Sequence, residues 1–212
     1  MMSDMDKGKL LVLTGGSGSG KDSVMRELVK MGWSRVVTHT AGRDPRPGEV
    51  DGQDYHFVSR EKFEEMKNNG EFLEWVVYGE TLKGTSKKEV ENVLQGKKVV
   101  WRIDATAAAK VEDILRKGLG DEAGELISGM VVVYLKAEDE NIIFERALRR
   151  DNIRSLDIIS SRIDADKKEW EENREKFKNV VINKEGALHQ TVEQVLKIAE
   201  EKQFQQDGNR SL

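Results

Sequence analysis

The chain has 212 residues, and its 35 Lys and Arg residues against 39 Asp and Glu residues give a formal net charge of −4. That length suits one large α/β domain, or a core with a small insert. The absence of cysteine excludes disulfides, zinc–thiolate sites, iron–sulfur clusters and thiol catalysis. No apolar run reaches the roughly 20 residues of a membrane helix, and the first run is too short for a signal peptide. Since mild acidity disfavours nucleic-acid binding, we expect a cytoplasmic enzyme or binding domain with neither nucleic-acid nor membrane partners.

Short apolar runs alternate with helical patterns along the chain. Strands are predicted at residues 10–13, 35–38, 72–77, 98–103, 130–135 and 180–182. Helices are predicted at residues 21–31, 59–68, 107–117, 138–149, 158–177 and 188–199, with another after residue 85. This alternation predicts an α/β fold, a doubly wound parallel sheet with helices on both faces. Ligands of such sheets bind beyond the carboxyl ends of the strands.

A glycine-rich loop connects the first predicted strand to the first predicted helix. Residues 15–21 read Gly-Gly-Ser-Gly-Ser-Gly-Lys and match the phosphate-loop pattern G-x-x-x-x-G-K. Glycines let successive backbone N–H groups face an anion, the helix adds its positive end, and Lys21 would reach the outer phosphates. The expected nucleotide contacts are Gly15, Gly16, Ser17, Gly18, Ser19, Gly20, Lys21, Asp22 and Ser23. The simpler alternative is a glycine-rich turn that binds no ligand.

Asp22 departs from this pattern, which has a Mg²⁺-binding serine or threonine after the lysine. A carboxylate about 5 Å from a phosphate charge costs roughly 3 kcal/mol at an effective dielectric near 20. A Mg²⁺ ion between the two groups reverses that sign, because carboxylate oxygens bind Mg²⁺ well. Asp22 is therefore a candidate metal ligand. The alternative is an acid stabilised by the positive end of the helix.

The segment at residues 43–55 combines arginines, prolines and a tyrosine. Pro45 and Pro47 favour the polyproline II conformation, whose three-residue repeat puts Arg43 and Arg46 on one edge. Two guanidinium groups on one edge can bind a single phosphate, and Tyr55 adds a hydroxyl. The alternative is a solvated surface loop with ordinary charges.

Together these motifs resemble the guanylate kinase family. The matching stretches are GGSGSGK, RDPRPGEVDGQDYHFVS, NGEFLEW, GTSKKEVE, the strand that ends at Ile103 and Asp104, and VVIN at residues 180–183. They follow the order of the family over nearly the whole chain. The resemblance implies a single domain of the P-loop NTPase type over residues 1–212. It would have a core at about 8–37 and 95–200, an acceptor-binding insert at about 38–94, an arginine-rich lid at about 149–160 and a polar tail at 201–212.

The resemblance implies phosphorylation of GMP and dGMP by ATP, with Mg²⁺ as cofactor, in a monomer or homodimer. Arg43, Arg46 and Tyr55 would hold the GMP phosphate. Glu74 and Asp104 would accept the N1–H and N2–H groups of guanine, supported by Thr85. Adenine lacks both donors, so AMP would leave the carboxylates unpaired.

The resemblance also implies cations around the triphosphate. Arg149 or Arg150, together with Arg162, match lid arginines, and Arg154 is another candidate. Asn183 matches an asparagine near the ATP base. The implied catalytic cations are Lys21, Arg46, Arg150 and Arg162. Phosphoryl transfer needs alignment and charge neutralisation, so neither a covalent intermediate nor a general base is required.

Besides Asp22, further departures lie around the acceptor. The family's serine contact falls on either Thr38 or His39, because a one-residue insertion fits before Arg43. Leu82 and Lys83 stand where the family usually has two tyrosines, so Lys83 would supply a charge in place of a phosphate-binding hydroxyl. After Asp104, Ala105-Thr106-Ala107 stand where the family has x-Gln-Gly. Arg102 replaces an acid often found there. Two alternatives stay open: a kinase of another phosphorylated acceptor such as ribose 1,5-bisphosphate, and a non-catalytic protein-binding module. The intact glycine loop and the stretch RPGEVDGQDYHFV favour GMP.

Overall fold

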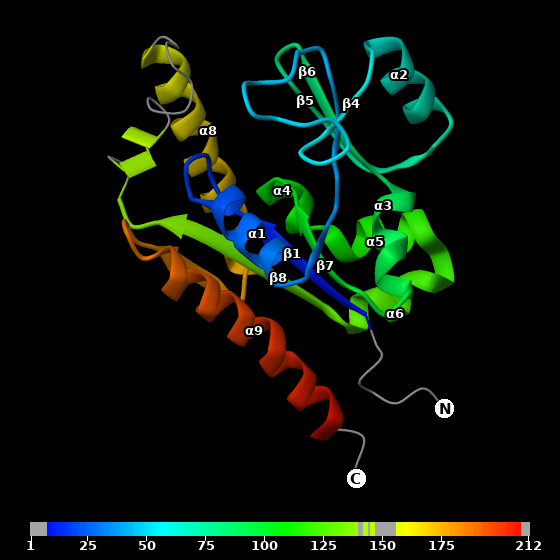
Figure 1. Cartoon of the computed structure of the whole chain (residues 1–212), viewed down its shortest axis with the longest axis vertical. Helices are drawn as coiled ribbons and strands as arrows, with labels where there is room; N and C mark the ends of the chain where they lie inside the picture. Colours follow the sequence, from blue (N-terminus) through cyan, green and yellow to red (C-terminus); the bar gives the residue numbers. More distant parts are fainter. Residues whose placement is uncertain (1–7, 140–141, 144, 147–155, 209–212) are drawn as a thin grey trace.

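A five-stranded parallel sheet forms the centre of the computed structural model, which describes residues 8–139, 142–143, 145–146 and 156–208. The strand order is β2-β7-β1-β8-β9, and every neighbouring pair is parallel (Figure 1). The strands are β2 (Ser34–Arg35), β7 (Lys98–Arg102), β1 (Lys9–Thr14), β8 (Met130–Ala137) and β9 (Val180–Asn183). The parallel sheet predicted from the alternating pattern is confirmed.

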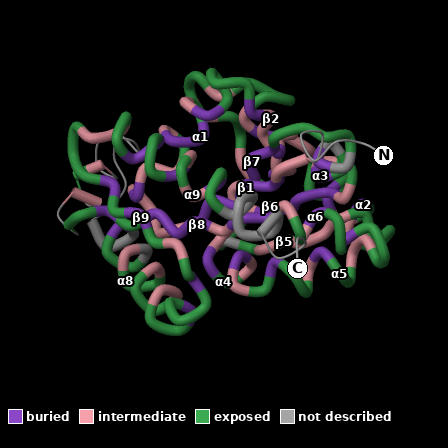
Figure 2. Tube along the Cα trace, turned by 90° about the horizontal axis from the view of Figure 1, so that it is seen from below, coloured by how far each residue is buried: buried purple, intermediate pink, exposed green. Residues whose placement is uncertain are grey.

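Helices cover both faces of this sheet, because successive residues of a buried strand point to opposite sides. Leu11 and Leu13 of β1 pack with buried residues of α1 (Lys21–Lys30) and α9 (Leu188–Gly208). Leu10 and Val12 belong to the opposite core, with α5 (Val111–Leu119), α6 (Ala123–Ser128) and α3 (Lys87–Leu94). Figure 2 shows the buried residues concentrated along the central strands.

A second, smaller sheet is built from residues 39–86. Its strands are β3 (His39–Ala41), β4 (His56–Phe57), β5 (Phe72–Tyr78) and β6 (Thr81–Ser86), in the order β4-β3-β6-β5. Phe63 of α2 (Arg60–Asn68) packs against Ala41 and Leu82 of this sheet. In Figure 1 the second sheet and α8 (Leu156–Asn173) rise on the same side of the central sheet.

Some predicted boundaries were wrong. The strand expected at 35–38 is only Ser34–Arg35, because the chain then leaves the central sheet and joins the second one at His39. The helix expected at 107–117 is two helices, α4 (Ala105–Ala108) and α5. The helix expected at 158–177 begins at 156 and ends at Asn173, before a 3₁₀ turn. The strands β3, β4 and β6 and the helix α6 were not predicted.

The helix expected at 138–149 falls partly outside the described residues. In the part of the chain that the structure describes, every helix is too short or too polar to span a bilayer.

Candidate functional site

The glycine loop leads from the carboxyl end of β1 into α1, and two of its glycines have no substitute. Gly15 has a φ of 137°, and a Cβ there would lie 2.0 Å from the carbonyl oxygen of Leu135. Gly20, the N-cap of α1, has a φ of 92°, and its Cβ would lie 2.1 Å from the Nδ2 atom of Asn183. Backbone conformation and close approach both require glycine, so the loop follows directly from its sequence.

Side chains from two elements hold the loop in shape. Lys21 Nζ donates to the carbonyl oxygens of Gly15 at 2.5 Å and Gly16 at 2.6 Å. Asn183 Nδ2 donates to the carbonyl oxygen of Ser19 at 2.9 Å, and Thr191 Oγ1 donates to Asn183 Oδ1 at 2.9 Å. The buried Asn183 therefore braces the loop from β9. Its contact with an ATP base stays a prediction.

Two residues that sequence reasoning missed also contact the loop. Asp166 Oδ2, on α8, accepts a hydrogen bond from the backbone N–H of Ser17 at 2.6 Å. Arg146 Nη1 donates to the carbonyl oxygen of Gly18 at 2.9 Å, and its Nη2 binds Glu185 at 2.6 Å. Only weak signals pointed to them. Asp166 follows the candidate Arg162 by one helical turn, and Arg146 precedes the arginine-rich stretch.

In the arginine–proline segment, a carboxylate occupies the edge predicted to hold a phosphate. Arg43 donates from both terminal nitrogens to Glu49, at 2.7 and 3.0 Å. The backbone N–H of Arg46 donates to the same carboxylate at 2.8 Å. Although burial opposes it, these hydrogen bonds leave the pKa of Glu49 below its ordinary value. The segment thus gathers donors from Arg43 and Arg46 around one anion.

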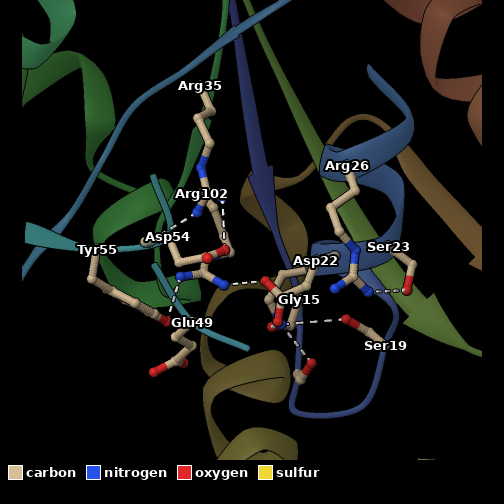
Figure 3. Close-up of polar contacts among 12 residues, drawn as sticks. Gly15, Ser19, Asp22, Ser23, Arg26, Arg35, Glu49, Asp54, Tyr55 and Arg102 are labelled. Carbon is tan, nitrogen blue, oxygen red and sulfur yellow. Dashed lines mark hydrogen bonds and ion pairs between the residues drawn. The ribbon is translucent and has the colours of Figure 1, made fainter. Parts of the chain in front are cut away.

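Three cations surround the buried ring of Tyr55. Arg43 Cζ lies 5.0 Å, Arg102 Cζ 5.3 Å and Lys83 Nζ 5.4 Å from the ring centroid. Arg102 Nη2 also donates to the hydroxyl oxygen of Tyr55 at 2.6 Å (Figure 3). Burial acts to raise the pKa of Tyr55, but the positive charges of Arg102 and Lys83 leave it below its ordinary value. Positive charge is therefore concentrated where the sequence predicted the acceptor phosphate.

Asp22 has a partner that the sequence did not indicate. Arg102 Nη1 donates to Asp22 Oδ1, so a cation of the protein itself faces this carboxylate. Both predicted roles of Asp22, metal ligand and helix acid, are compatible with this contact, because 51% of its side chain stays exposed. The ion pair reduces the cost of a carboxylate beside the phosphate loop.

At the other end of the site, two carboxylates converge. Glu74 lies opposite Thr85 in the β5–β6 ladder, and Thr85 Oγ1 donates to Glu74 Oε1 at 2.6 Å. Trp101 Nε1 donates to the same Thr85 oxygen at 3.0 Å. Asp104 is the N-cap of α4 and accepts from the Ala107 N–H at 2.9 Å. Burial, aided by the charge of Asp104, raises the pKa of Glu74 to about 7. Such a carboxylate pair favours a ligand that donates hydrogen bonds.

Thr38 and His39, the two candidates for a contact with the acceptor base, lie just before and at the start of β3. The carbonyl oxygen of Thr38 accepts the N–H of His56 at 3.0 Å. The His39 ring packs 4.6 Å from the His56 ring and 5.6 Å from the Phe72 ring, and burial lowers its pKa. The contacts of Thr38 and His39 with the acceptor base stay predictions.

Most of the predicted lid arginines lie outside the described residues. Arg149, Arg150 and Arg154 lie outside the described residues, and Arg162 lies in α8 with its side chain not described. Ser23 Oγ accepts a hydrogen bond from Arg26 at 3.4 Å. Within the described ranges, no group of three or more His, Asp or Glu side chains forms a ready-made metal site.

Comparison with known proteins supports the resemblance to the guanylate kinase family. The guanylate kinase family model matches residues 7–202. Guanylate kinase 2, chloroplastic/mitochondrial, of Oryza sativa is 37% identical over 190 residues, which cover 88% of this chain and 61% of the rice protein. The guanylate kinase of onion yellows phytoplasma is 34% identical over 184 residues, covering 85% of this chain and 81% of that one.

A solved structure supports the fold. The guanylate kinase of Anaplasma phagocytophilum superposes with a TM-score of 0.67 at 23% identity, over 93% of this chain and 87% of that chain. The family match spans most of the chain, and the phytoplasma relative is covered over more than two thirds of its length. This chain belongs to the guanylate kinase family.

Proposed function

We propose that this protein transfers the γ-phosphoryl group of ATP to GMP and dGMP, producing ADP and GDP or dGDP. The observation that carries the proposal is the division of charge across the site. Glu74 and Asp104 offer acceptors at one end, and the cations around Tyr55 gather at the other. GMP has the matching distribution, with N–H donors on its base and an anionic phosphate.

The donor nucleotide would bind at the glycine loop. Its phosphates would meet the backbone N–H groups at the start of α1 and the positive end of that helix. Lys21 would turn from the carbonyl oxygens of Gly15 and Gly16 toward the outer phosphates. Asn183 and Arg146, which bond to the loop, would keep it in a conformation that fits the triphosphate.

The described residues would bind Mg²⁺ with few protein ligands, as is usual in enzymes that bind nucleotide phosphates. One carboxylate, Asp22, lies at the start of α1, and the other ligands would be phosphate oxygens and water. When bound, the ion would neutralise charge on the triphosphate. Asp22 would hold it, directly or through water, while keeping or releasing its contact with Arg102.

The protein's own contribution is alignment and exclusion of water. We propose that residues 38–94 act as the acceptor-binding part and 149–160 as the lid, which together shield the phosphates. No side chain has to take a proton from GMP, because its phosphate oxygen is already ionised at neutral pH. The cytoplasm is the expected location, and a monomer or homodimer is expected.

An acceptor panel tests this function. ADP release from ATP and Mg²⁺ is measured with GMP, dGMP, AMP, UMP, CMP and ribose 1,5-bisphosphate. We expect turnover with GMP and dGMP only. Turnover with the sugar phosphate alone would reassign the acceptor, and silence with all six would point to a protein-binding module.

Arg46→Ala tests the phosphate end. Since its guanidinium is proposed to hold the GMP phosphate, the substitution should raise the KM for GMP at least tenfold and lower kcat, with the Kd for ATP changed less than twofold. Arg116→Ala, an exposed arginine on α5, is the control and should match the unaltered protein. An unchanged GMP dependence in Arg46→Ala would remove this residue from the site.

Glu74 predicts a pH dependence. Because burial raises its pKa to about 7, Glu74 is mostly protonated at pH 6 and ionised at pH 8, and only the ionised form accepts guanine N–H groups well. The KM for GMP should therefore fall about tenfold between pH 6 and pH 8. The GMP phosphate itself titrates near pH 6, so Glu74→Gln, which keeps that contribution, is the comparison. Equal pH profiles in the two proteins would contradict the assignment.

Asp166→Asn tests the loop. The Asp166 carboxylate accepts the Ser17 N–H, so a negative charge lies where phosphates are expected. Asparagine keeps the shape and removes the charge, and the Kd for ATP should fall about fivefold, roughly 1 kcal/mol. Calorimetric titration would measure it, with Asp164→Asn on the exposed side of α8 as control. Weaker ATP binding would mean that Asp166 assists the nucleotide.

A further inference from the structure

Arg102 lies between the two halves of the site. It ends β7 and pairs in register with Leu13 of β1, one residue before the strand ends at Thr14. Figure 3 shows its guanidinium between Asp22, on the first turn of α1, and Tyr55, in the acceptor segment. Only 17% of the Arg102 side chain is exposed. One largely buried cation therefore touches both the helix of the phosphate loop and the group proposed to bind the acceptor phosphate.

The charges around Arg102 indicate what this position is suited to bind. Arg43, Lys83 and Arg102 all lie within 5.4 Å of the Tyr55 ring centroid, although like charges repel. Glu49 faces Arg43, and Asp22 faces Arg102. An anion with several charges, such as a phosphate, can satisfy more of this cluster than one carboxylate does.

The two arms of the guanidinium have different partners. Nη2 donates to the buried hydroxyl of Tyr55 at 2.6 Å, whereas Nη1 donates to Asp22, half of whose side chain is exposed. An exposed carboxylate can turn toward solvent or a metal ion, but the buried tyrosine cannot. Nη1 is therefore the arm that can exchange a carboxylate oxygen for a phosphate oxygen.

Resting on the proposed function, we infer that Arg102 is a catalytic residue that binds the phosphoryl group while it passes from ATP to GMP. An oxygen of the GMP phosphate forms a bond to the γ-phosphorus as the bond to the β–γ bridging oxygen breaks. The bonding electron pair stays on ADP. Four negative charges on ATP and two on GMP become three on ADP and three on GDP, so Arg102 keeps its proton and neutralises charge on the group in transfer.

A double-substitution experiment distinguishes this role from simple neutralisation of Asp22. We compare the unaltered protein with Arg102→Met, Asp22→Asn and the double variant, using GMP and ATP. Arg102→Met should lower kcat at least 100-fold with a KM for GMP changed less than fivefold. The double variant should be as slow as Arg102→Met. If Asp22→Asn restores kcat to within fivefold of the Asp22→Asn variant alone, Arg102 only neutralises Asp22 and the inference is wrong.

A binding measurement checks the same inference without turnover. ADP, Mg²⁺ and aluminium fluoride with GMP imitate the phosphoryl group in transfer. Arg102→Met should weaken this fluoride-dependent complex at least tenfold, while the Kd values for ATP and for GMP alone change less than threefold. Equal affinity in both proteins would overturn the inference.

Arg35→Met is the matched control. The Arg35 side chain is also 17% exposed and has its own ion pair, with Asp54 at 3.2 Å. It should form the fluoride complex as tightly as the unaltered protein. An equal loss in Arg35→Met would show that Arg102→Met acts through the fold and would also overturn the inference.

Failure of the proposed function would be recognised separately. If the unaltered protein phosphorylates ribose 1,5-bisphosphate and not GMP, the proposed acceptor is wrong. The unaltered protein, Arg102→Met, Asp22→Asn and the double variant are then compared with the sugar phosphate as acceptor. If kcat falls equally in Arg102→Met and in the double variant, the catalytic role of Arg102 is supported. If the unaltered protein transfers phosphate to no acceptor, both the proposed function and the role of Arg102 are wrong.

Discussion

The parallel pairing of β1 with β7 is the constraint on which the site depends. The register aligns Leu13 with Arg102, so the glycine loop and the residues that follow β7 reach the same edge of the sheet. Packing supports this register, because Leu11 and its partner Val100 are almost fully enclosed in the same core, and a slip of one residue would place them on opposite faces. Hydrophobic packing thus sets the distance between the loop and the carboxylate of Asp104.

Three of the protein's own carboxylates pair with donor groups of the site. Glu49 faces the guanidinium of Arg43, Asp22 faces Arg102, and Asp166 accepts from a backbone N–H of the glycine loop. Each of these anions lies where the proposed function requires a phosphate. A bound phosphate would therefore exchange places with a carboxylate of the protein. Glu74 differs from these carboxylates, because it is buried with few positive neighbours. Its pKa is raised for that reason.

Local patterns were sufficient to predict part of this arrangement. The glycine loop, helix α1 and the buried parallel strands have short-range signals in glycine spacing and apolar runs. Strand β6, which reads Thr-Leu-Lys-Gly-Thr-Ser, has no such signal and is a strand because β3 and β5 pair with it. The contacts of Arg102 with Asp22 and of Asp166 with Ser17 join segments 80 and 149 residues apart. Contacts over such separations leave no local pattern, so only the folded chain reveals them.

In the proposed site, Glu74 and Asp104 would together recognise the two donors on the edge of guanine. The most direct measurement is kcat/KM for IMP relative to GMP, because IMP keeps the N1–H group and lacks only the 2-amino group. For IMP, kcat/KM should be about 10- to 100-fold lower than for GMP, because one buried charged acceptor is left unpaired. Equal kcat/KM values for the two nucleotides would contradict it and would leave the carboxylate pair without a role in base recognition.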